Sequence, residues 1–123
     1  MTSDEMFVAA MNLRIKCGLD TTSDELMVIK RSSLYKLFHF LYDIRDDPMG
    51  YICWAEISED ALWMMEASGN LPKYPYEWAE GKIVLITDVV LDPKWKKKGF
   101  RDLLGLRRNN PHVKYLKRER RQS

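Results

Sequence analysis

The sequence predicts a single α/β (α+β) domain in which helices flank a small mixed sheet. Helix-capping signals recur along the chain, and residues 39–44 and 50–57 are two strand-like segments joined by the turn sequence RDDPMG. Residues 83–91 are a β-branched apolar run, typical of a central strand that is buried on both faces. The expected order is helix, helix, hairpin, helix, strand, helix, strand.

Capping and stop residues define the predicted helices. The second helix is expected to begin near Ser23, because Thr22 and Glu25 form a Thr-x-x-Glu capping box. A basic helix is expected over 96–108, and a last short strand over 113–119. The expected cap and stop residues of the first and third helices are Ser3 with Gly18 and Ser58 with Gly69.

The length of 123 residues suits one domain spanning 1–123, with a core that needs no disulfide. Cys17 and Cys53 fit neither a disulfide framework nor a metal-ligand pattern, so we expect reduced, buried thiols and no metal site. No apolar run reaches about 18 residues, which argues against a membrane span. The acidic N-terminus differs from a secretory signal, so these features predict a cytoplasmic protein.

Charge is divided unevenly along the chain, although the net charge is only +2. Residues 94–123 contain twelve Lys or Arg against two acids, a charge of +10. Residues 1–93 contain eight basic and sixteen acidic residues, a charge of −8. The basic C-terminal segment 94–123 favours an acidic protein partner, an acidic part of a neighbouring subunit, or nucleic acid bound through 94–121. A solvated helix face followed by a loose tail explains the same pattern.

Two short motifs resemble those of one enzyme family. They are GYICWAEIS at 50–58 and EWAEGKIVLITDVVLDP at 77–93, in which Trp78, Gly81 and Asp88 have the spacing W-x2-G-x6-D. With LRRNNPHVKYLKRER at the basic end, they resemble the toxin-activating lysine acyltransferases, which load fatty acyl groups onto lysines of RTX haemolysins. The resemblance implies a GNAT-like fold with the thioester entering beside the central strand. It also implies no bound cofactor, an acyl-carrier protein as donor and a protein lysine as acceptor.

The resemblance further implies two catalytic residues, a histidine near the start of the second helix and an aspartate on the strand. Asp88 matches the aspartate, but the place of the histidine falls around residues 17–21, CGLDT, which contain none. A buried carboxylate is costly unless it is paired. Asp88 is therefore either an acid–base group or, as we favour, part of a structural polar network at a bulge with Thr87. His39 is the candidate base, although its aromatic neighbours are more typical of a packed residue.

The candidate substrate-binding residues are aromatic and basic. Trp54 and Trp78 are predicted to be core anchors, with the lining of an acyl channel as the alternative. Four basic residues are candidates for contacting the phosphate of a carrier's pantetheine arm or of nucleic acid: Lys96, Lys97, Lys98 and Arg101. Gly99 alone does not make the glycine-rich turn of enzymes that use acetyl-CoA, so an acidic acyl-carrier protein fits the basic helix better.

Two functions follow as hypotheses. The first is a divergent toxin-activating acyltransferase that transfers an acyl group from acyl-carrier protein to a protein lysine. The second is a non-catalytic GNAT-like binding or structural protein acting through its basic end. A phage virion or host-takeover protein is an example, which would place it in the host cytoplasm or the virion. The missing histidine is the feature that separates the two.

Overall fold

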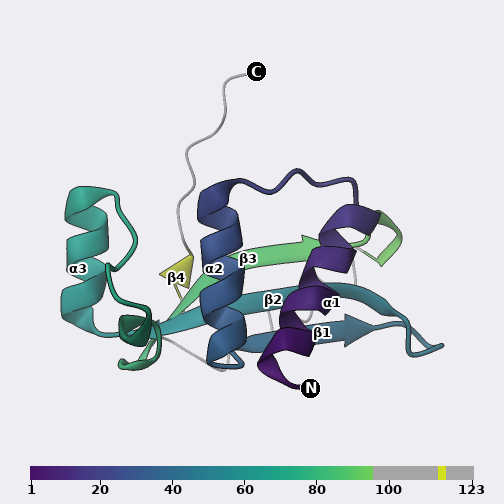
Figure 1. The fold of residues 1–123 in the computed structure, drawn as a ribbon, viewed down its shortest axis with the longest axis horizontal. Coiled ribbons are helices and arrows are strands. Elements are labelled where there is room, and N and C mark those ends of the chain that lie inside the picture. Colours follow the sequence, from purple (N-terminus) through teal and green to yellow (C-terminus); the bar gives the residue numbers. More distant parts are fainter. Residues whose placement is uncertain (96–113, 116–123) are drawn as a thin grey trace.

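The computed structural model of the chain describes residues 1–95 and 114–115 (Figure 1). Its elements follow the predicted order. Their bounds are α1 Ser3–Lys16, α2 Ser23–Leu34, β1 Phe38–Tyr42, β2 Pro48–Ile57, α3 Glu59–Ser68, the short 3-10 helix η1 Pro75–Ala79, β3 Ile83–Leu91, η2 Pro93–Trp95 and β4 Lys114–Tyr115. The basic helix expected over 96–108 lies outside the described residues. The α/β (α+β) class is confirmed.

The four strands form one mixed sheet in the order β1-β2-β3-β4. The pairs β1–β2 and β2–β3 are antiparallel, whereas β3 and β4 are parallel. The two motif-bearing strands, β2 and β3, are therefore neighbours, and α3 lies between them in the chain, as the strand-helix-strand order predicted. In the part of the chain that the structure describes, no helix is long and apolar enough to cross a membrane.

Helices α1 and α2 lie against one face of the sheet (Figure 1). The core between them and the sheet contains Ala10, Leu13, Val28 and Ile29 from the helices, and Tyr51, Cys53, Ala55 and Ile57 from β2. Both Leu85 and its neighbour Ile86 are buried, so β3 is buried on both faces, as its apolar run predicted. Asp88 lies in this strand, and its environment is the starting point for the site.

The helix ends explain where the elements begin. Thr22 caps α2 and forms the expected capping box with Glu25. The cap of α1 was predicted one residue too late: Thr2, not Ser3, accepts the backbone N–H of Glu5, whose carboxylate accepts the Thr2 N–H. The sequence Thr-x-x-Glu is thus used twice. The predicted start and stop of α3 are confirmed by the N-cap Ser58 and the left-handed C-cap Gly69.

Candidate functional site: the Arg14 network

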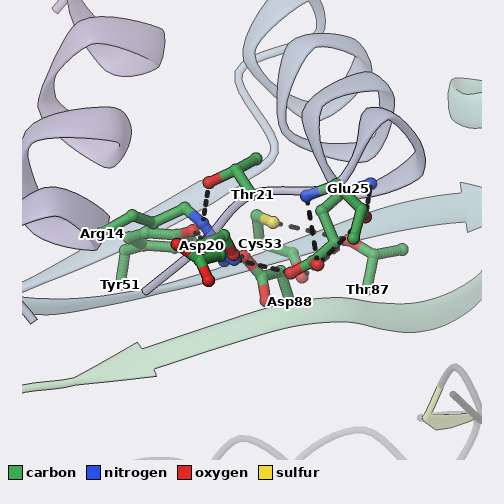
Figure 2. A network of polar contacts seen from close by, with 9 residues as sticks. Arg14, Asp20, Thr21, Glu25, Tyr51, Cys53, Thr87 and Asp88 are labelled. Carbon is green, nitrogen blue, oxygen red and sulfur yellow. Dashed lines mark hydrogen bonds and ion pairs between the residues drawn. The ribbon is translucent and has the colours of Figure 1, made fainter. Parts of the chain in front are cut away.

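Asp88 is buried, and two donors among the described residues bind it (Figure 2). Nη1 of Arg14 donates to Oδ2 of Asp88 at 2.8 Å, and the hydroxyl of Tyr51 donates to the same oxygen at 2.5 Å. Arg14 is itself only 3% exposed. A guanidinium and a carboxylate at this depth are tolerated because each satisfies the other.

The remaining donors of Arg14 reach the helical layer. Nη2 forms an ion pair with Oε2 of Glu25 at 2.6 Å and also donates to the backbone carbonyl of Asp20 at 3.1 Å. Nε donates to Oγ1 of Thr21 at 2.9 Å. One side chain therefore joins α1, the α1–α2 loop, the start of α2 and β3. We call Arg14, Asp20, Thr21, Glu25, Tyr51 and Asp88 the Arg14 network.

The charges of the Arg14 network are fixed by its surroundings. Burial alone would lower the pKa of the Arg14 guanidinium, but its hydrogen bond with Tyr51 and the negative charges of Asp88 and Glu25 outweigh burial and raise that pKa. Burial, followed by the charge of Asp88, raises the pKa of Tyr51 well above its ordinary range. Tyr51 therefore stays a protonated donor, and Oδ2 of Asp88 faces a permanent cation.

The network lies beside an irregularity in the sheet. Cys53 pairs with Asp88 and Trp54 pairs with Ile86, so Thr87 is the extra residue of a bulge. The hydroxyl of Thr87 donates to the carbonyl of Cys53 at 3.2 Å and lies 3.4 Å from its sulfur. This confirms the expected bulge at Thr87 and Asp88. Both cysteines are free thiols among the described residues; Cys53 is buried as expected, whereas Cys17 is only half-buried, so its expected burial was wrong.

His39 and Asp88 lie on opposite sides of the sheet. His39 is exposed on β1 and pairs with Ile52, one residue from Tyr51 along β2. Successive side chains of a strand point to opposite faces, so His39 faces away from the side on which Tyr51 meets Asp88. The two residues suggested as a catalytic pair are not brought together. The loop at 17–21, where the resemblance places a histidine, does meet the network through Asp20 and Thr21.

The two tryptophans of the resembling motifs meet through α2. Trp78 is completely buried, and its Nε1 donates to Oγ of Ser32 at 3.0 Å. Ser32 in turn donates to the carbonyl of Trp54 at 2.9 Å. Trp78 is thus held as a core anchor, and Trp54 is half-buried beside the same cluster. A Cβ at Gly81 would lie 1.8 Å from the carbonyl carbon of Ile57, so only glycine permits this approach of the motif to the end of β2.

Two clefts can be placed in the described residues, and neither includes Asp88. One of about 480 Å³ lies between α3 and the segment that follows it, and one of about 470 Å³ lies between α1 and α2. Lys96, Lys97, Lys98 and Arg101 lie outside the described residues. Within 1–95 and 114–115, no group of three His, Cys, Asp or Glu side chains could hold a metal ion.

Comparison with known proteins gave no match. No family model, no curated protein and no solved structure matches the chain. The site therefore has to be interpreted from its own residues.

Sequence reasoning singled out Asp88 and missed Arg14, Glu25 and Tyr51. A signal for Arg14 exists: it follows Ala10 and Leu13 at the spacing of one helix face, so α1 places it in the buried stripe. A buried arginine on a helix and an aspartate in an apolar strand each require a partner, and pairing them is the economical solution.

Proposed function

We propose that this chain is a divergent acyltransferase of the toxin-activating type, using acyl-carrier protein as donor and a protein lysine as acceptor. One observation supports the proposal: the loop at 17–21 and Asp88 contact the same guanidinium. The resemblance places its two catalytic positions on just these segments. These segments are at least 67 residues apart in the sequence (21 to 88), and the guanidinium of Arg14 brings them to one site.

In this proposal Asp88 acts by orienting and does not itself remove a proton. Its Oδ2 is bound by Arg14 and Tyr51, so the network fixes the α1–α2 loop against β3. The neutral lysine amine attacks the thioester carbonyl carbon, the new C–N bond forms, and the C–S bond breaks. The released thiolate of the carrier takes up the proton that the nitrogen loses, so no external reactant is needed.

A second candidate is a non-catalytic relative that acts by binding, as a phage virion or host-takeover protein would. Two observations favour it. The loop at 17–21 holds no histidine, and the only described histidine, His39, is on the opposite face of the sheet. The carboxylate of Asp88 is paired with Arg14 at 2.8 Å, which suits a structural cross-link. Contacts with an acidic protein or nucleic acid would then come from the basic segment 94–123.

An acyl-transfer assay distinguishes the two. Wild-type protein is incubated with acyl-carrier protein carrying a labelled acyl chain and with a lysine-containing acceptor, and the acceptor is analysed by mass spectrometry. Transfer by wild type, lost in Asp88→Asn at a temperature where the variant is still folded, supports the enzyme. Asp92→Asn is the matched control, because Asp92 pairs with the exposed Lys16 on the surface at 3.7 Å.

A third variant tests the missing histidine directly. Asp20 is exposed and contributes only its backbone carbonyl to Arg14 among the described contacts, so Asp20→His leaves the network intact. Activity that is absent in wild type and gained in Asp20→His would show that the site has lost only its base. Inactivity of both proteins with every carrier-bound chain length would reject the acyltransferase proposal and leave the binding protein.

A further inference from the structure

A cleft on the side of α3 has an excess of negative charge. It has a volume of about 480 Å³, in the range of ligand sites. We call it the acidic cleft, and its lining includes Asp60, Tyr76, Glu77 and Glu80, with Lys73 as the one basic residue among the described lining residues. It shares no residue with the Arg14 network. Its ligand is therefore a separate question from acyl transfer.

The charge around the acidic cleft extends beyond its lining. Residues 56–80 contain six acids and a single lysine, a charge of −5. Helix α3 borders the cleft along its length, from the N-cap Ser58 to Ser68 and Asn70 at its C-terminal end, and its last turn contains no basic residue. The C-terminal end of a helix is the negative end of its dipole. Because the positive N-terminal end of α3 borders the cleft as well, it is the excess of acidic side chains that favours a cation.

One wall of the cleft is tied to the core. Nη1 of Arg31 donates to the carbonyl of Pro72 at 2.6 Å, and the same guanidinium lies over the ring of Trp78 at 5.5 Å. Pro72 lines the cleft, and Trp78 is completely buried. The wall is therefore held in place before a ligand arrives, which lowers the entropy cost of binding.

An aromatic ring is half exposed in the cleft. Tyr76 is 51% exposed and stacks on Tyr74, with ring centroids 5.4 Å apart. The ammonium of Lys73 already lies over the ring of Tyr74 at 5.4 Å. Tyrosine rings attract ammonium and guanidinium groups through their negative faces. This segment already pairs cations with aromatic rings, at Lys73 and at Arg31.

Among the described residues, the cleft has three acidic lining residues, Asp60, Glu77 and Glu80, so its charge suits a ligand with several positive charges. No three of them converge closely enough to hold a metal ion, within the described residues. We propose that the acidic cleft binds a lysine- or arginine-rich polypeptide segment of a partner protein. One cationic side chain of that segment packs against Tyr76, and neighbouring ones face Asp60, Glu77 and Glu80. This inference stands whether or not the chain transfers acyl groups.

A peptide titration tests the proposal on the full chain. The probe is a fluorescein-labelled lysine–serine repeat peptide, followed by fluorescence anisotropy at low and at high salt, with a glutamate–serine peptide as the negative control. We expect the protein to bind the lysine–serine peptide and not the glutamate–serine peptide. High salt should weaken this binding, because salt screens exposed charges. Removing two carboxylates of the cleft, the half-buried Glu77 and the exposed Glu80, in Glu77→Gln/Glu80→Gln should weaken binding about fivefold. Tyr76→Leu should weaken it about threefold.

A matched control separates the cleft from general acidity. Glu59→Gln/Glu66→Gln removes the same charge from exposed positions on α3 that do not line the cleft. This pair should change binding less than about twofold. Any of three results would overturn the proposal: the two double substitutions weaken binding equally, the lysine peptide does not bind, or neither salt nor Tyr76→Leu changes its binding. Melting curves of every variant confirm that the folded chain is being compared.

Discussion

Replacing Asp88 by asparagine removes one charge of a buried ion pair and keeps the shape of the side chain. Breaking such a pair on one side costs about 3–5 kcal/mol, because the other charge is left buried. In this protein Arg14 retains Glu25 as a second counter-charge at 2.6 Å, and an asparagine oxygen can still accept the Tyr51 hydroxyl. The loss should therefore approach that of a hydrogen bond to a charged group, about 2–3 kcal/mol.

Urea unfolding followed by circular dichroism measures this loss. For a chain of 123 residues, 1 kcal/mol corresponds to about 4 °C in melting temperature, so Asp88→Asn should melt about 8–12 °C lower. The same substitution at Asp92, whose partner Lys16 is 56% exposed, should cost less than about 1 kcal/mol.

A double-mutant cycle shows whether the pair is the cause. Arg14→Met combined with Asp88→Asn should cost less than the sum of the single changes, because the interaction between the two side chains can be lost only once. An Asp88→Asn protein within about 0.5 kcal/mol of wild type, or strictly additive effects, would refute the description of the Arg14 network as a buried ion-paired unit.

Two further predictions follow from other contacts, and a third from the charge of the basic segment. The pKa of Tyr51 is higher in the folded than in the unfolded chain, so its contribution to stability is complete below about pH 10 and is lost as the pH rises. Above that pH the free energy of unfolding should fall by up to about 1.4 kcal/mol per pH unit. Urea unfolding at alkaline pH measures this fall, and Tyr51→Phe should remove it. Gly81→Ala should cost about 2–3 kcal/mol, measured by urea unfolding, because its Cβ overlaps the backbone of Ile57, whereas Gly69→Ala meets no neighbouring atom and should cost about 1 kcal/mol for its positive φ. Changing residues 96–98 to serine should weaken binding to duplex DNA, RNA or acyl-carrier protein and should reduce the salt dependence of that binding. If the wild type and the variant bind equally and salt has no effect on either, the basic end is only a solvated face.

Local signals predicted the elements of the fold well. The ends of β3, the start of α2 and the stop of α3 were all predicted from residues within one turn of the boundary, which is where caps and turns act. The error at α1 has the same origin: Thr2 and Ser3 are both good caps, and only Thr2 has a glutamate three residues later.

The site was less predictable because its contacts are not local. Arg14 and Asp88 are 74 residues apart, and no periodic pattern within either segment specifies that α1 will cross β3. The face occupied by His39 depends in turn on the register of β1 against β2. A buried aspartate in a sequence predicts that a partner exists, but which residue is the partner depends on how the helices pack on the sheet.

The position of Arg14 has a consequence for how the molecule opens. Its guanidinium binds groups 6, 7, 11, 37 and 74 residues away, so these bonds can all form only after the hairpin, β3 and both helices have docked. If α1 peeled away alone, it would leave Asp88 and Glu25 without their shared cation, which makes partial detachment costly. In native-state hydrogen exchange, the amides of α1 and those at the start of α2 should therefore become exposed in one cooperative step, at a free energy close to that of β3.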